Sequence, residues 1–254
     1  MSLAGKLALV TGASMPRGSG KAAALALARD GADVVVTGYN NMDGVKAASE
    51  EIKAMGRKSM ALKVNGRDYA DVQRALAEIK KELGPVNILV NNMAQMRHFV
   101  PMSKITIQDW ESDITLCLNS AFYCTKEVWA DMVASKYGRI INLTSVAGVM
   151  GGSGQAGYAA AKSGLIGFTK SLALEGARSN VTANCVLIGT ANTEAYYEPI
   201  PEETRLKFEK RIAMRRPAEP EEIADAIAFA VSDKAKYMTG AIVNMMGGLD
   251  LFVF

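Results

Sequence analysis

The chain has few cysteines and a single histidine, and these shortages exclude several kinds of site. Its 254 residues include three cysteines, none in a CxxC or Cys/His spacing that binds metal ions. Cys117, Cys124 and Cys185 cannot all pair with one another. We therefore expect no metal site and free thiols in a reducing compartment, and we interpret Cys117 and Cys124 as small buried side chains.

Long hydrophobic runs and an excess of one charge are also missing. No apolar stretch reaches the roughly 18 residues of a membrane span, and the chain runs almost directly into Leu7–Thr11, which leaves no room for a signal peptide. There are 29 basic and 26 acidic residues, a net charge of +3, with no basic tract. We expect a cytoplasmic protein without a membrane or nucleic-acid partner.

The chain does have a regular alternation of short β-rich runs and longer helical patterns, with no repeat or linker to divide it. Continuous apolar strands between helices are typical of a parallel sheet covered on both faces, wound in both directions. The sequence predicts one α/β domain over 1–254, a doubly wound Rossmann fold with a seven-stranded parallel sheet. The expected strands are 7–11, 33–37, 59–64, 87–91, 139–144, 181–187 and 241–245, and the expected helices include 20–30, 45–55, 69–83, 108–135, 155–178 and 220–232.

One irregular stretch, from Thr190 to about Pro201, interrupts this alternation and leads into the charged helical segment Glu202–Arg211. It follows the sixth expected strand, and open α/β sheets bind ligands at the carboxyl ends of their strands. We interpret about 190–213 as a lid over a substrate pocket.

The first strand leads into a glycine-rich turn, Thr11-Gly12-Ala13-Ser14-Met15-Pro16-Arg17-Gly18-Ser19-Gly20, and a helix follows. Glycines let the backbone approach a pyrophosphate closely, and the helix N-terminus favours the negative charge. This turn resembles the Thr-Gly-x-x-x-Gly-x-Gly pattern of the classical short-chain dehydrogenase/reductases. Met15 and Pro16 are extra by comparison, so we expect the loop to bulge at an unchanged location.

The end of the second strand bears on the choice of dinucleotide. NAD requires a carboxylate there for the ribose hydroxyls, whereas this strand ends Thr37-Gly38-Tyr39-Asn40-Asn41. Asp33 lies at the start of the strand and Asp43 in the next helix. A 2′-phosphate instead requires a cation, which Arg17 supplies. We expect NADP(H) to be favoured over NAD(H), with a solvated loop arginine as the alternative.

Further matches to the family continue to about residue 248. Asn65 stands where the resemblance implies an adenine contact, Asn91-Asn92-Met93-Ala94 resembles Asn-Asn-Ala-Gly, and 188–193 resembles Pro-Gly-x-x-x-Thr with Ile in place of Pro. The pattern Asn244-Met245-Met246-Gly247-Gly248 lacks the family's Asp. The expected coenzyme-binding residues are Gly12, Ser14, Arg17, Gly18, Ser19, Gly20, Tyr39, Asn40, Asn41, Asn65, Asn92, Ala94, Tyr158, Lys162, Ile188, Gly189 and Thr193.

Tyr158 and Lys162 are four residues apart in an expected helix, so a phenol and an ammonium share one face. Free tyrosine titrates near about 10, and a nearby cation lowers the pKa of the phenol toward a range useful for proton transfer. On a helix surface the same spacing is also an ordinary pair of amphipathic side chains.

The context favours catalysis. Ser145 ends the fifth strand thirteen residues before Tyr158, as in the short-chain dehydrogenase/reductases, and Asn119 matches their catalytic Asn on the fourth helix. The resemblance implies that hydride from the nicotinamide reaches a carbonyl carbon while Ser145 holds the oxygen and Tyr158 protonates it. Lys162 would also hold the nicotinamide ribose, and Asn119 a water between Lys162 and solvent. The reverse reaction oxidises a secondary alcohol.

The substrate is poorly specified by the sequence. An apolar set of candidate pocket walls favours a hydrophobic or cyclic ketone. His98, the single histidine, is a candidate substrate contact, but a loop or packing role is favoured for it. The alternative is a 3-oxoacyl-[acyl-carrier-protein] reductase, the nearest subgroup by general resemblance. Such an enzyme docks an acidic carrier with basic surface residues, for which Lys136 and Arg178 are candidates that fit solvated charges equally well. A catalytically idle NADP-binding module is the second alternative. The candidate substrate residues are Met96, His98, Met150, Leu187, Tyr196 and Tyr197.

The resemblance also implies a homo-oligomer, a dimer or tetramer that pairs through the fourth and fifth helices. The apolar tail Leu249–Phe254 would be costly if exposed. We expect it to be covered by a neighbouring subunit or by the chain's own core.

Overall fold

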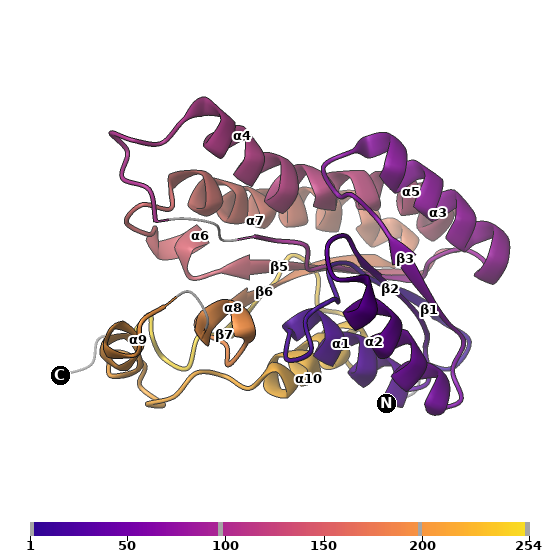
Figure 1. The fold of residues 1–254 in the computed structure, drawn as a ribbon. Coiled ribbons are helices and arrows are strands. Elements are labelled where there is room, and N and C mark those ends of the chain that lie inside the picture. Colours follow the sequence, from indigo (N-terminus) through magenta and orange to yellow (C-terminus); the bar gives the residue numbers. More distant parts are fainter. Residues whose placement is uncertain (1–2, 96–98, 198–199, 252–254) are drawn as a thin grey trace.

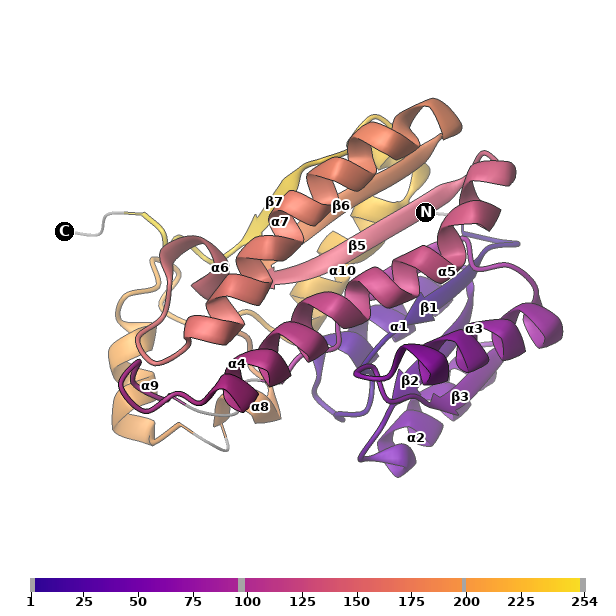
Figure 2. The same ribbon diagram turned by 90° about the horizontal axis from the view of Figure 1, so that it is seen from above.

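Seven strands form one sheet in the computed structural model, which describes residues 3–95, 99–197 and 200–251. Their order is β3-β2-β1-β4-β5-β6-β7, and all neighbours are parallel. Figures 1 and 2 show the sheet from two directions. The predicted doubly wound Rossmann sheet is confirmed. The strands are β1 (Leu7–Val10), β2 (Asp33–Gly38), β3 (Ser59–Lys63), β4 (Ile88–Asn91), β5 (Gly138–Ser145), β6 (Val181–Ile188) and β7 (Ile242–Met245).

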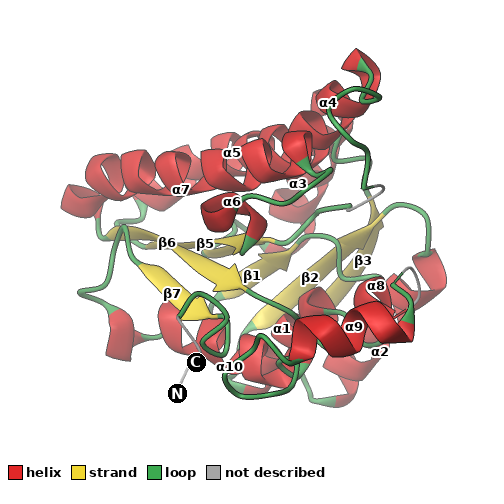
Figure 3. Cartoon of the chain, turned by 90° about the vertical axis from the view of Figure 1, so that its left-hand side faces the viewer, coloured by secondary structure: helices red, strands yellow, loops and turns green. Residues whose placement is uncertain are grey.

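Helices cover both faces of the sheet (Figure 3). Strand side chains alternate between the faces, so Ala8 and Val10 belong to one apolar core and Leu7 and Leu9 to the other. The first core is closed by α1 (Ser19–Arg29), α2 (Met42–Ala54) and α10 (Pro220–Val231), and the second by α3 (Tyr69–Leu83), α5 (Ser120–Ala134) and α7 (Ala156–Gly176).

The helix expected over 108–135 is not uniform. It consists of α4 (Ile107–Ile114), a π-helical turn η1 (Thr115–Asn119) and α5. A π turn adds a residue to the helix without ending it, so the hydrophobic pattern runs through it unbroken. The single helix expected here was therefore wrong in its middle.

The stretch after β6 is less irregular than expected. It contains the short helix α8 (Glu194–Tyr197) and then α9 (Glu202–Glu209). Both lie at the end of the sheet where β5 and β6 finish (Figure 1). The remaining short elements are α6 (Ala147–Met150), η2 (Ala177–Ser179) and η3 (Asp233–Ala235).

The thiols of Cys117, Cys124 and Cys185 are free and buried, which agrees with the burial predicted for Cys117 and Cys124. None of the helices in the described ranges is long and apolar enough to cross a bilayer. Residues 252–254 of the apolar tail lie outside the described part of the chain, so its covering stays a prediction.

Candidate active site

The glycine-rich loop between β1 and α1 is held by Asn92, which follows β4. The side-chain nitrogen of Asn92 donates to the carbonyl oxygens of Thr11 and Gly12, both at 2.9 Å. A Cβ atom at position 20 would stand 2.5 Å from that nitrogen, and Gly12 has a φ of +69°. Glycine at 12 and 20 is thus required by the packing of this loop.

The two extra residues, Met15 and Pro16, are accommodated in a turn in which Gly18 N donates to Met15 O at 3.0 Å. The loop leans on the start of α2. There the Asn41 side chain donates to Ser14 O at 2.9 Å. A Cβ atom at position 44 would collide with Ser14 O, so this position requires glycine. Asn41 also caps α2 by accepting from Gly44 N, so its amide serves the loop and the helix.

The start of α1 fits a phosphate group. The cap residues Asn41, Asp68 and Thr106 accept hydrogen bonds from backbone amides at the starts of α2, α3 and α4. The cap of α1 is Gly18, which has no side chain to accept, and the first turn contains no acid. Its amides and the positive end of the helix dipole are thus available to an anion.

A carboxylate from the far end of the chain lies against this loop. Glu194 Oε1 accepts from the backbone nitrogen of Arg17 at 2.8 Å. Glu194 Oε2 is buried and has no hydrogen-bond partner among the described residues.

The end of β2 presents Tyr39, Asn40 and Asn41, all exposed. The ammonium of Lys63 lies 5.1 Å from the centre of the Tyr39 ring. Lys63 pairs with Gly38 in the β2–β3 register. A cation therefore stands beside the predicted adenosine end, and sequence analysis missed it because nothing in the β2 pattern points to the neighbouring strand.

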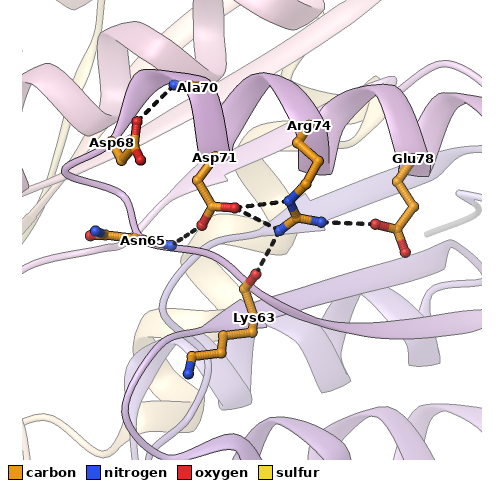
Figure 4. A network of polar contacts seen from close by, with 7 residues as sticks. All are labelled: Lys63, Asn65, Asp68, Ala70, Asp71, Arg74 and Glu78. Carbon is orange, nitrogen blue, oxygen red and sulfur yellow. Dashed lines mark hydrogen bonds and ion pairs between the residues drawn. The ribbon is translucent and has the colours of Figure 1, made fainter.

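The turn after β3 holds Asn65 in place (Figure 4). Asn65 N donates to Asp71 Oδ2 at 2.7 Å, and Asn65 Oδ1 accepts from Arg67 N at 3.2 Å. The pKa of Asp71 is lowered, first by the Asn65 backbone hydrogen bond and then by Arg74. Arg74 also donates to Lys63 O at 3.1 Å and pairs with Glu78 at 3.0 Å. The adenine contact itself stays a prediction.

Ser145, Tyr158 and Lys162 come together at the carboxyl end of β5. The Ser145 hydroxyl lies close enough to the Tyr158 phenol to lower the pKa of Tyr158 as a hydrogen-bond partner. Lys162 Nζ lies 5.8 Å from the centre of the Tyr158 ring, on the next turn of α7. A phenol, an alcohol and an ammonium thus meet at one point, which is the arrangement for donating a proton to an oxygen.

The pKa of Tyr158 lies above its ordinary value in this structure. Burial raises it to about 12, and Cys117 and Asp113 add to the increase, while the Ser145 hydrogen bond lowers it. Burial likewise lowers the pKa of Lys162. Burial is thus the dominant influence on the pKa of Tyr158 in this structure, and the lowering of that pKa by Lys162 together with the oxidised nicotinamide stays a prediction.

Cys117 is a member of this site that sequence analysis interpreted only as core. It is 1% exposed, lies in the π turn, and affects the pKa of both Tyr158 and Lys162. A π turn inside a longer helix is often found at a functional site, but the hydrophobic pattern gave no sign of it. Asn119 ends the same turn, half-buried, and its catalytic role stays a prediction.

Lys162 is held through its side chain and its backbone by residues close to Ser145 in the chain. Lys162 Nζ donates to Leu143 O at 2.8 Å, and Thr144 Oγ1 donates to Lys162 O at 2.7 Å. A Cβ at Gly148, on α6, would stand 2.8 Å from the Lys162 carbonyl carbon. The positions of Ser145 and Lys162 are therefore coupled directly.

Known proteins match the chain over nearly its full length. The family model described as enoyl-(acyl carrier protein) reductase matches residues 12–250. A 3-oxoacyl-[acyl-carrier-protein] reductase from Synechocystis is 40% identical and covers 99% of both chains, and the one from Escherichia coli is 40% identical over 98% of this chain and 99% of its own. A solved structure described as a short-chain alcohol dehydrogenase from Sinorhizobium meliloti has a TM-score of 0.92 at 32% identity, covering 99% of both chains.

The chain belongs to the short-chain dehydrogenase/reductases. It is an NAD(P)-dependent oxidoreductase that acts on CH–OH or C=O groups.

In this short-chain dehydrogenase/reductase, Ile188-Gly189 at the end of β6 passes close to the loop that follows β7. A Cβ at Gly189 would stand 2.9 Å from the Met246 Cα, and Met246 is buried. The buried Met246 takes the place of the family's Asp. Thr193 lies just before α8, with its backbone nitrogen bonded to Ala191 O at 2.8 Å.

The predicted substrate residues divide into three groups. Met96 and His98 lie outside the described residues. Leu187 and Tyr196 are buried, and the Tyr196 ring packs edge-on against Tyr197 at 5.2 Å. Met150 and Tyr197 remain exposed, at 52% and 38%. Of the four predicted substrate residues that the structure describes, only these two present substantial side-chain surface to solvent.

Lys136 and Arg178 do not lie near the catalytic residues within one chain. Lys136 precedes β5 and Arg178 precedes β6, so both stand at the amino ends of strands whose carboxyl ends are Ser145 and Ile188. The eight residues of β5 span about 26 Å at roughly 3.3 Å per residue. The structure thus separates the predicted carrier-docking cations from the site.

Proposed function

We propose that this short-chain dehydrogenase/reductase reduces a 3-oxoacyl thioester presented by an acyl carrier protein, with NADPH as coenzyme. The observation that carries the proposal is that the Ser145 hydroxyl and the Tyr158 phenol meet at the end of β5, with Lys162 fixed one helical turn away. The named relatives, 40% identical over their full length, support the 3-oxoacyl substrate over the free hydrophobic or cyclic ketone that the sequence first favoured.

The residues divide the work in the following way. Ser145 donates a hydrogen bond to the substrate oxygen as negative charge develops on it. Tyr158, whose raised pKa keeps the phenol protonated at neutral pH, gives its proton to that oxygen. Lys162 keeps its ammonium next to the phenol and holds the coenzyme ribose. The nicotinamide, when bound, supplies the hydride.

NADPH is favoured over NADH by the charges around β2. Arg17 is exposed in the glycine loop, Lys63 stands over Tyr39, and neither Tyr39, Asn40 nor Asn41 can replace the carboxylate that ribose hydroxyls require. A 2′-phosphate would meet two cations and no acid at the strand end.

An assembly of several copies fits the exposed faces of the helices. Phe122 on α5 is 47% exposed and packs against Phe168 of α7 at 6.2 Å. A second copy placed on α4 and α5 would cover this apolar surface. Light scattering of the purified chain tests for a dimer or tetramer against a monomer.

The activity test compares one 3-oxoacyl group on three scaffolds: acyl carrier protein, coenzyme A and a free ester, with a cyclic ketone alongside. We expect the highest kcat/KM with the carrier-linked substrate. Tyr158→Phe should lose turnover by at least about a hundredfold while it retains NADPH binding. Preference for the cyclic ketone would favour the free-ketone alternative, and a Phe variant as active as the parent would contradict the catalytic assignment.

A further inference from the structure

We infer that Cys117 is a positioning residue of the active site, held against Tyr158 and Lys162 by the π turn between α4 and α5. The inference rests on the proposed function, because it assigns a role within the same proton-transfer site. The thiol makes and breaks no bond in the reaction and acts only through the phenol and the ammonium. Asn119, which the sequence favoured for this turn, faces away from them.

The π turn η1 lies directly against α7, because glycines on α7 leave room for it. A Cβ atom at Gly157 would stand 2.9 Å from Asp113 Oδ2, and a Cβ atom at Gly164 would stand 3.0 Å from Leu118 Cδ2. Asp113 lies near the end of α4, and Leu118 lies in the turn. Figure 2 shows α4 and α5 running beside α7. The end of α4 and the turn are therefore packed closely on the part of α7 that carries the catalytic pair.

Within the π turn, Cys117 is the residue that faces inward. It is 1% exposed, and of the five residues of the turn, all of them described, it alone is buried. Residues two apart in a helix do not share a face. A turn that directs Cys117 toward the catalytic pair therefore directs Asn119 elsewhere, and Asn119 is only half-buried.

Titratable and polar groups from four elements lie around the Tyr158 phenol. Burial is the first cause of its raised pKa, and Cys117 is the next cause that raises it. Negative charge on a nearby thiol opposes the formation of a phenolate. Cys117 therefore helps to keep the proton on Tyr158, and the protonated phenol is the form that reduces a carbonyl. The groups around the phenol are Cys117 on η1, Asp113 on α4, Ser145 on β5 and Lys162 on α7.

The Lys162 ammonium is influenced by thiols from two elements. Lys162 is 3% exposed, and burial lowers its pKa, whereas Cys117 on η1 and Cys185 on β6 act in the opposite direction. A thiol is only a weak hydrogen-bonding group, so the influence of Cys117 on the ammonium is electrostatic and steric. Cys117 thus favours a charged lysine beside a protonated phenol, which is the state from which the proposed reduction begins.

The first test is the pH profile of kcat for one 3-oxoacyl group on acyl carrier protein and on coenzyme A. Cys117→Ser keeps nearly the same size and removes the ionisable thiol. We expect the alkaline limb of the profile to move to lower pH, with KM and the Kd of NADPH within about twofold of the parent. Cys117→Ala should move the limb in the same direction and serves if the Ser variant does not fold. Cys124→Ser, an equally buried thiol in the core beneath α5, is the control and should leave the limb in place.

The second test needs no substrate. Urea unfolding at alkaline pH is compared for the parent, Cys117→Ser, Tyr158→Phe and the double variant. Removal of the thiol should bring the pKa of folded Tyr158 closer to its unfolded value, so the loss of stability at high pH that is due to Tyr158 becomes smaller. That part of the effect of Cys117→Ser should be absent in the Tyr158→Phe background, which also subtracts the titration of the thiol itself.

Three results would overturn the inference. An equal shift of the limb in Cys124→Ser would make Cys117 an ordinary core residue. A larger shift in Asn119→Ala than in Cys117→Ser would return the role to Asn119. An effect of Cys117→Ser on alkaline stability that is the same with and without Tyr158 would mean that the two side chains do not interact. If the parent reduces neither thioester, the proposed substrate fails, and the unfolding comparison still decides the role of Cys117.

Discussion

Glu194 reaches across the molecule to Arg17, 177 residues earlier, and accepts a 2.8 Å hydrogen bond from its backbone nitrogen. The contact joins the segment after β6 to the glycine-rich loop. It places a carboxylate beside the helix end that fits a phosphate, so an anionic coenzyme must approach a fixed negative charge.

Glu194→Gln should strengthen NADPH binding. The amide oxygen of Gln still accepts from Arg17 N, but the repulsion between carboxylate and phosphate is gone. Because a partly exposed charge interaction contributes about 0.2–1 kcal/mol, we expect Kd to fall by roughly 1.4-fold to fivefold, and less at high salt. Fluorescence titration measures it.

Glu202→Gln is the matched control for this change. Glu202 is an exposed carboxylate in the first turn of α9, on the same segment. It should leave Kd unchanged. Equal effects of the two substitutions would indicate a long-range charge effect, and weaker NADPH binding by Glu194→Gln would mean that the carboxylate charge itself supports the coenzyme-binding loop.

The fold could be predicted from the sequence because each apolar run is long enough to identify its own strand. Runs such as Leu7–Val10 and Val181–Ile188 are buried on both faces, which few other structures permit. The π turn at Thr115–Asn119 escaped prediction because it leaves the apolar face of the helix continuous. Periodicity reports which face is buried, and not how the backbone is bonded.

Sequence spacing predicted which residues form the site, but not the contacts that depend on how strands and helices pack. The spacing of Tyr158 and Lys162 fixes them on one helix face, and strand ends fix Ser145. The position of Lys63 over Tyr39 depends on the register of β2 and β3. The hydrogen bond from Thr144 to Lys162 O depends on how α7 packs on β5. The pKa of Tyr158 depends on burial, which spacing does not contain.

Tyr158 should make stability fall at alkaline pH. Its pKa is about 12 in the folded chain and about 10 when unfolded, so the folded state holds the proton more tightly. Its contribution to stability is therefore complete below about pH 10 and is lost as pH rises toward about 12. Urea unfolding across this range should show a steeper loss for the parent than for Tyr158→Phe. Parallel curves would mean that the phenol titrates normally.

Gly148→Ala should slow turnover by disturbing Lys162. The added Cβ would stand 2.8 Å from the Lys162 carbonyl carbon and 2.9 Å from Ser163 N, so α6 and α7 must move apart. Small displacements between reacting groups are costly, and we expect kcat to fall by about tenfold or more. Gly167→Ala, on the exposed side of α7 with nothing within 4 Å of its Cβ, is the control and should retain kcat.

Thr144→Val tests the same coupling without adding bulk. It removes the hydroxyl that donates to Lys162 O at 2.7 Å. One neutral hydrogen bond contributes about 0.5–1.5 kcal/mol, so we expect kcat to fall by roughly twofold to tenfold, with a shifted pH profile. Thr144→Ser should restore both. Thr125→Val, an equally buried threonine that bonds Asn91 instead, should affect stability alone.

Arg17→Ala and Lys63→Met should distinguish the contributions of the two cations to binding of the NADPH 2′-phosphate. Arg17 lies in the loop beside the start of α1, and we expect its loss to weaken NADPH by at least about tenfold, since a charge-assisted hydrogen bond contributes roughly 1.5–3 kcal/mol. Lys63 already lies 5.1 Å from the Tyr39 ring, so its loss should cost only about threefold. Neither should change the Kd of NADH by more than about twofold, because NADH has no 2′-phosphate. If Lys63→Met weakens the binding of NADPH and NADH equally, Lys63 supports the Tyr39 ring and does not contact the 2′-phosphate. If Arg17→Ala leaves NADPH binding intact, the preference for NADPH comes from Lys63 on β3 rather than from the glycine-rich loop.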